Sequence, residues 1–155
     1  MSKRKPEPIS GFQGEYRFLS NFWMCTVNIG GLKFPSAEHA YQASKSSFPE
    51  IWFKMLKLSS PFQAKRLGKN IPIRPNFDEM KLSFMEEIVT AKFHQNRALG
   101  NLLLDTGDRE IIETNTWNDT YWGVCNGWGQ NHLGKILMNV RNDLQIERAM
   151  ENDTR

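Results

Sequence analysis

The strongest constraint on the fold is a long amphipathic segment at residues 76–94. Apolar side chains recur along it at helical spacing, and they fall into two adjacent rows. The rows are Phe77, Met80, Phe84, Ile88 and Ala91, and Leu82, Met85, Val89 and Phe93. Two adjacent rows make an apolar face that is too broad for a surface helix. We therefore expect this segment to be the central core helix.

Shorter helices are expected on both sides of the core helix. Ser36 is a good N-cap for the helix that follows it, and Pro61 suits the first turn of a helix that starts at Ser60. Helical segments are expected at 36–45, 49–58, 60–69 and 96–104, and a final helix from about residue 133 to about residue 146.

Strands are expected to be few and short. Met24–Ile29 alternates in polarity, and Gly30 and Gly31 then turn the chain into Leu32–Phe34, which is typical of a hairpin. Glu110–Thr114 predicts one more short strand. Helices dominate, and strands and helices do not alternate as in a parallel βαβ sheet. The expected fold class is α+β, mostly helical, with a small sheet of short strands.

Length and composition are those of one ordinary globular domain. The chain has 155 residues, of which 39% are hydrophobic and 24% charged. The first residues are basic and contain prolines, whereas the last residues show no apolar periodicity. We expect a flexible tail at residues 1–14, a single domain at 15–146 and a frayed C-terminal end at 147–155.

The charge is distributed unevenly along the chain. The net charge of +3 is too small to identify a partner, but the stretch from residue 51 to residue 77 holds no acid. Its cations are Lys54, Lys57, Lys65, Arg66, Lys69 and Arg74. They fit either a surface that binds a phosphate-bearing ligand or nucleic acid, or a solvated face whose acids come from other segments.

Histidines and cysteines are too scattered to predict a metal site. Cys25, Cys125, His39, His94 and His132 form no pair with metal-ligand spacing. No apolar run reaches transmembrane length, and the N-terminal residues lack the hydrophobic segment of a secretory signal. We expect no metal, no cofactor and no membrane partner, and a cytoplasmic location with both thiols free.

Residues 129–135 (GQNHLGK) match the opening of a phosphate-binding P-loop, but the next residue argues against one. A P-loop needs Ser or Thr after its lysine to hold magnesium, and Ile136 stands at that position. Gly127, Gly129 and Asn131 nevertheless lead into a helix N-terminus, whose N–H groups favour an anion. Glycines that serve only a tight turn are the alternative.

Polar residues of the helix at 36–45 share one face. Glu38, Gln42 and Lys45 are spaced so that a carboxylate, an amide and an ammonium form a stripe. The stripe is either an exposed network of i,i+4 pairs or one wall of a polar site. The spacing alone favours the exposed network.

Aromatic residues also gather in segments without a regular period. Asp119 and Trp122 lie in an expected loop, where a flat ring can stack on the indole with the carboxylate at its edge. Loop tryptophans that cover a core are the alternative. Earlier in the chain, Arg17, Ser20 and Asn21 stand among aromatic residues, either to orient a sugar or to form turns.

The order of these motifs resembles the NADAR family, which is associated with NAD and ADP-ribose metabolism. The resemblance runs from about residue 16 to residue 141. It rests on FLSNF (18–22), FPSAEHAYQASK (34–45), AKRLGK (64–69), KFHQN (92–96), LLLDTGDREIIE (102–113) and WNDTYWG with GWGQNHLGKILMNVR (117–141).

The resemblance implies metal-independent hydrolysis of an N-glycosidic bond. Implied substrates are early riboflavin-biosynthesis ribosylamine phosphates or ADP-ribosyl adducts of nucleobases, and nucleic acid enters only as such an adduct. Glu38 and Asp119 would share stabilisation of the oxocarbenium-like ribose and protonation of the amine, in an order left open, and Trp122 would stack on the base. The implied substrate contacts are Asn21, Phe22, Gln42, Lys45, Lys69, Glu113, Gly123 and Asn131.

Two other classes of function stay open from the residues themselves. A binding module for ADP-ribose, a nucleotide or single-stranded nucleic acid would also use the cationic stretch and the loose aromatic residues. A structural partner protein would instead expose a large apolar patch. The enzyme hypothesis further expects Glu38, Asp119 and Trp122 to face one cleft.

Overall fold

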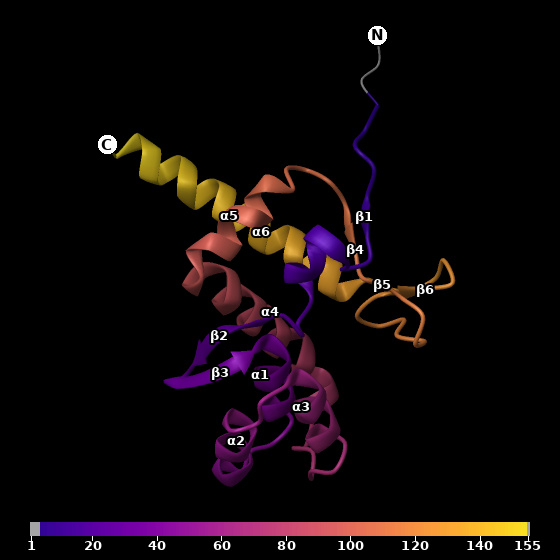
Figure 1. Cartoon of the computed structure of the whole chain (residues 1–155), viewed down its shortest axis with the longest axis vertical. Coiled ribbons are helices and arrows are strands. Elements are labelled where there is room, and N and C mark those ends of the chain that lie inside the picture. The colour runs from indigo at the N-terminus through magenta and orange to yellow at the C-terminus, as the bar shows by residue number, and fades with distance from the viewer. Residues whose placement is uncertain (1–3, 155) are drawn as a thin grey trace. The chain divides into compact units, whose positions relative to one another are not determined.

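A computed structural model describes residues 4–154 of the chain (Figure 1). The chain divides into two compact units, and each of them is described by itself. One unit is the continuous segment Ser20–Arg97. The other combines the residues up to Leu19 with those from Ala98 onward.

The continuous unit begins with the expected hairpin. Strand β2 (Met24–Ile29) pairs antiparallel with β3 (Leu32–Ser36), with a register shift between Met24 and Val27. The glycines at the turn both have positive φ, which glycine adopts without steric cost. The hairpin contacts helix α1, as Figure 1 shows. The predicted hairpin is thereby confirmed.

Three short helices follow, each at an expected place. They are α1 (Ala37–Ser44), α2 (Pro49–Leu56) and α3 (Pro61–Gly68). The Ser36 hydroxyl caps α1 by accepting from the backbone N–H of His39 at 3.1 Å. The Ser60 hydroxyl caps α3 in the same way, through the N–H of Gln63 at 3.2 Å. Helix α2 ends two positions earlier than the sequence pattern predicts.

Helix α4 (Phe77–Gln95) is the long helix that the two apolar rows predict. It contacts α1 and β2, and residues from both rows are buried: Phe77, Met85, Ile88, Val89 and Phe93. Met80 is 36% exposed, so the buried face is narrower than predicted at its start. The role of α4 as the core helix of its unit is otherwise as expected.

The expected flexible tail at residues 1–14 contains ordered structure. Strand β1 (Ile9–Ser10) pairs parallel with β4 (Ile111–Ile112), and a 3-10 helix, η1 (Gly14–Leu19), follows. The Ile9 side chain is 1% exposed. The prediction was wrong for residues 9–14 because the partner strand lies far away in the sequence. Residues 1–3 lie outside the described part of the chain.

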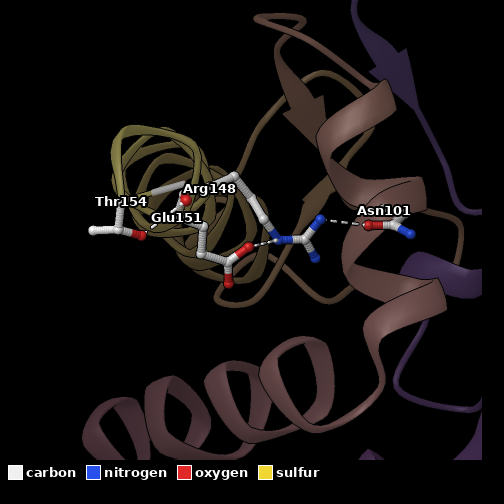
Figure 2. A network of polar contacts seen from close by, with 4 residues as sticks. All are labelled: Asn101, Arg148, Glu151 and Thr154. Carbon is white, nitrogen blue, oxygen red and sulfur yellow. Dashed lines mark hydrogen bonds and ion pairs between the residues drawn. The ribbon is translucent and has the colours of Figure 1, made fainter.

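The C-terminal helix is longer than the sequence predicts. Helix α6 (His132–Asp153) continues well past Ile146, beyond the point where its apolar face ends. Polar contacts accompany this extension: Arg148 Nη1 donates to Asn101 Oδ1 of helix α5 (Arg97–Asp105) at 2.6 Å, and Arg148 Nε lies 4.0 Å from Glu151 Oε2 (Figure 2). The expectation of a frayed end after Ile146 was therefore wrong.

The remaining two strands lie on either side of the loop at residues 116–123, which contains Trp117 and Trp122. Strand β5 (Thr114–Asn115) pairs parallel with β6 (Val124–Cys125), and residues 116–123 connect them. Within residues 4–154 the strands form three two-stranded sheets, and helices dominate, which confirms the α+β class. Among residues 4–154, the helices are too short or too polar to span a lipid bilayer.

Candidate functional site

The polar stripe on α1 is buried. Glu38 is 7% exposed and Gln42 is 4% exposed, and Gln42 Nε2 donates to Glu38 Oε1 at 2.7 Å. The exposed network, which the spacing alone favours, is therefore wrong for these two residues. A buried carboxylate and amide joined by a hydrogen bond fit the alternative, one wall of a polar site.

Lysines surround the buried carboxylate. Burial raises the pKa of Glu38 above its usual value, and the hydrogen bond from Gln42 and the charges of Lys65 and Lys45 offset part of that rise. Burial lowers the pKa of Lys45, Glu38 opposes this, and Lys65, Lys69 and Lys81 lower it further. The site thus joins one carboxylate with several ammonium groups, which is a suitable environment for a phosphate.

Asn21 and Phe22 extend the site from the segment before β2. The Asn21 backbone carbonyl accepts from the N–H of Glu38 at 3.0 Å, and its Nδ2 donates to Met85 Sδ at 3.4 Å. Lys65 Nζ lies over the face of the Phe22 ring, 5.9 Å from the ring centroid. Both predicted substrate contacts therefore belong to the same neighbourhood as Glu38.

Phe62 also belongs to this neighbourhood, although no pattern in the sequence indicates it. Its ring meets Phe22 edge to face at 4.9 Å, yet 64% of the residue is exposed. In the sequence, Phe62 belongs to no periodic apolar row, so the segment that forms α3 predicts only a surface position for it. An exposed ring beside a polar site can bind a flat ligand ring.

The acid-free stretch serves several purposes. Lys65 and Lys69 belong to the lysine group around Glu38 and Lys45. Arg74 has a structural contact instead, since its Nη2 donates to the Ser46 carbonyl at 2.7 Å. Lys54 is exposed on α2. The stretch is therefore a ligand-binding candidate at α3 rather than along its whole length.

In the other unit, Asp119 organises a turn. Its Oδ1 accepts from the backbone N–H groups of Tyr121 at 3.1 Å and Trp122 at 2.9 Å. Among residues 4–154, no hydrogen bond uses its other oxygen, Oδ2. One oxygen is thus committed to the backbone, and a substrate contact of the carboxylate stays a prediction.

Glu113 and Asn115 form a polar cluster beside this turn. Asn115 Nδ2 donates to Glu113 Oε2 at 3.0 Å and to the Asp119 carbonyl at 2.8 Å, and Asn115 Oδ1 accepts from the Asp119 N–H. A Cβ on Gly123 would lie 1.8 Å from Glu113 Oε2 and 2.0 Å from the Glu113 carbonyl oxygen. Gly123 is therefore required by close packing. Its predicted substrate contact, like that of Glu113, stays a prediction.

At the N-terminus of α6, the backbone N–H groups of the N-cap and of the first two helical residues are already bonded, which weakens the anion hypothesis. The backbone N–H groups of Asn131, His132 and Leu133 donate to the carbonyls of Gly123, Tyr121 and Trp122. The Asn131 side chain bonds to the backbone of Glu113 and Ile111 at 2.9 Å each. The alternative, glycines that build a tight turn, is the better explanation.

Trp122 is half-buried and packs against its neighbour. Its ring meets Tyr121 edge to face at 4.8 Å, and Tyr121 lies 4.5 Å from the ring of His132. Trp117 and Trp128 are far more exposed. Stacking of a base on Trp122 stays a prediction, as does the expectation that Glu38, Asp119 and Trp122 face one cleft.

Comparisons with known proteins agree with the motifs. The NADAR domain model matches residues 10–145. The N-glycosidase YbiA of Shigella boydii is 37% identical over 137 residues, covering 86% of this chain and 85% of the relative. A riboflavin biosynthesis protein of Vibrio vulnificus is 39% identical over 131 residues, covering 83% of this chain and 35% of that protein. The NMR structure of Escherichia coli YbiA matches with a TM-score of 0.82 and 33% identity, covering 94% of this chain and 90% of that one.

Proposed function

The chain belongs to the NADAR family, and from this membership we propose that it is an N-glycosidase that hydrolyses the bond between a ribose 5-phosphate and a nucleobase-like amine. The observation that carries the proposal is the environment of Glu38. The buried Glu38 carboxylate accepts a hydrogen bond from Gln42, and the charges of Lys45 and Lys65 act on it. The site therefore combines an acid–base group with cations that can bind a phosphate.

The reaction assigns a clear task to a carboxylate. A water oxygen joins C1′ as the C1′–N bond breaks, and the departing nitrogen keeps the bonding electrons and takes up one proton. Positive charge develops on the ribose in the transition state, and a carboxylate stabilises it. Because burial raises the pKa of Glu38, its titration moves toward neutral pH, as proton transfer requires. We assign the proton transfer to Glu38.

The early pyrimidine ribosylamine phosphates of riboflavin biosynthesis are the proposed substrates. Several relatives carry the name N-glycosidase, and others are named riboflavin biosynthesis proteins. The lysines around Glu38 support a substrate with a 5′-phosphate; Lys65 is on α3, and Lys45 and Lys69 directly follow α1 and α3. An ADP-ribosyl nucleobase also carries phosphate beside an N-glycosidic bond, so it is the alternative substrate.

A turnover assay tests the proposal. The purified protein is incubated in EDTA with the pyrimidine ribosylamine 5′-phosphate, and release of ribose 5-phosphate is followed over time. Glu38→Gln replaces the carboxylate with an amide of the same shape. Glu86→Gln makes the same exchange at an exposed position on α4 and is the matched control.

Release by the wild type and by Glu86→Gln, with little release by Glu38→Gln, is the expected result. If the protein hydrolyses only ADP-ribosylated guanine, with release of ADP-ribose, the N-glycosidase activity is kept and the proposed substrate changes. Activity that disappears in EDTA and returns with a divalent cation would contradict a metal-independent mechanism. If neither substrate is hydrolysed, the N-glycosidase proposal is wrong.

A further inference from the structure

Gly68 is the last residue of α3 and lies against Gln42, so an added side chain there would collide with the Gln42 amide. A Cβ there would lie 1.8 Å from Gln42 Oε1, 2.7 Å from its Cδ and 3.3 Å from its Cβ. The position has no positive φ, so the backbone itself does not require glycine. The space taken by the Gln42 amide is therefore the structural reason for glycine.

The amide that fills this space is held in one orientation. Its Nε2 donates to Glu38, whereas its Oε1 is buried and finds no hydrogen-bond donor within residues 4–154. A buried acceptor without a donor costs about 1–3 kcal/mol. The orientation is thus not explained by the bonding of Oε1. It is explained by the hydrogen bond to the Glu38 carboxylate.

We propose that Gly68 is a positioning residue of the N-glycosidase, because it leaves the space in which Gln42 holds the Glu38 carboxylate for reaction. The inference rests on the proposed function of Glu38. Gly68 acts through Gln42 and does not itself touch the reacting atoms. The hydrogen bond from Gln42 also lowers the pKa of Glu38 against the effect of burial. Gly68 thereby influences both the orientation and the protonation of the carboxylate.

A role only in helix packing is the competing explanation, since α1 and α3 are in contact. The two explanations differ in what an added methyl group would displace. Two of the three nearest atoms belong to the end of the flexible Gln42 side chain, and none belongs to the backbone. Gly68→Ala should therefore move the amide away from Glu38 while the fold persists.

The test compares Gly68→Ala, Gln42→Ala and the double variant in kcat–pH profiles on the ribosylamine phosphate. Each single variant is expected to lower kcat by up to about 100-fold, since misplaced catalytic groups cost rate of that order. The limb of the kcat–pH profile that reports the ionisation of Glu38 should move to higher pH. The reason is that the hydrogen bond from Gln42, which lowers the pKa of Glu38, is lost. The double variant should be no worse than Gln42→Ala, since both changes break one contact.

Gln63→Ala on the same helix is the matched control. It removes a glutamine amide that bonds to Ser59, and it should leave the pH profile in place. A Gly68→Ala protein that melts earlier but keeps the wild-type pH profile would overturn the proposal and leave a packing role. Effects of the two single changes that simply add in the double variant would also contradict it.

An NMR titration of the Glu38 side-chain carboxyl separates this inference from the proposed function. The pKa of Glu38 should rise in Gly68→Ala and in Gln42→Ala relative to the wild type, whether or not a substrate is known. A rise without turnover on any substrate would refute the N-glycosidase function but keep the coupling of Gly68 to Glu38. An unchanged pKa in Gly68→Ala would refute the coupling itself.

Discussion

The two carboxylates that the motifs single out lie in opposite kinds of environment. Glu38 is on a regular helix, buried, and hydrogen-bonded to a side-chain amide, with lysine charges close by. Asp119 lies in a loop, and its Oδ1 accepts from two backbone N–H groups. The first arrangement changes the pKa of a carboxylate, whereas the second builds a turn. The same residue chemistry therefore leads us to expect different consequences of mutation in the two places.

The largest expected effect is on turnover, at Glu38. Glu38→Gln should lower kcat by roughly 10²–10⁴-fold, because an amide cannot exchange the proton that the reaction needs. The measurement is steady-state release of ribose 5-phosphate. A loss of less than about tenfold would place the acid–base group elsewhere and remove the main contrast between the two carboxylates.

The next effect is on substrate affinity, at Lys45. Lys45→Gln should raise KM by about 10- to 100-fold, since a hydrogen bond to a charged group contributes about 1.5–3 kcal/mol. Lys57→Gln, at an exposed position just after α2, is the matched control and should leave KM unchanged. Equal effects of the two substitutions would show that general positive charge, and not the lysine group around Glu38, attracts the phosphate.

At Asp119 the expected effect is on stability. Asp119→Ala removes the acceptor of two backbone N–H groups and should cost about 1–3 kcal/mol of unfolding free energy. Asp119→Asn keeps an oxygen at Oδ1 and should stay within about 0.5 kcal/mol of the wild type. Urea unfolding measures both.

The Asn variant then isolates the charge of Asp119. If its fold is preserved and turnover falls, the loss belongs to the carboxylate charge, as the family resemblance implies. If Asp119→Ala is as stable as the wild type, the turn-building role of Asp119 is wrong.

The smallest expected effect is the pH dependence of stability. Burial raises the folded-state pKa of Glu38 above the ordinary value of 4.5, so between the unfolded and folded pKa values the folded chain binds more protons. The protonated Glu38 side chain therefore contributes its full stabilisation below the pKa that it has in the unfolded chain. This stabilisation is lost as the pH rises through the pKa that Glu38 has in the folded chain. Glu38→Gln should melt higher than the wild type above that window, with a difference that shrinks toward pH 4. A difference that grows on acidification would contradict the raised pKa.

Local signals in the sequence were sufficient for much of the fold. The hairpin around Gly30, the Ser36 and Ser60 caps and the apolar rows of α4 all depend on neighbours within a few residues. Contacts between distant residues were not readable. Pairing of Ile9 with Ile111 and the hydrogen bond from Arg148 to Asn101 both join segments that no local pattern connects.

The candidate site divides in the same way. Spacing alone placed Glu38 and Gln42 on one helix face, but their burial depends on α3, where Gly68 packs against the amide. No pattern in the sequence marked Phe62, because its contact with Phe22 joins two segments far apart. The aromatic loop pattern and the resemblance to a family both singled out Asp119, yet only the structure shows that one of its oxygens serves the backbone.

The role of Glu38 in proton transfer is tested most directly by its own pKa. An NMR titration of its side-chain carboxyl in the wild-type protein can be set beside the pH dependence of kcat/KM, which reports the ionisations of the free enzyme. We expect a midpoint above that of an ordinary glutamate, coinciding with one limb of the rate profile. A midpoint at or below the ordinary value, or a rate profile with no limb at the measured midpoint, would contradict it.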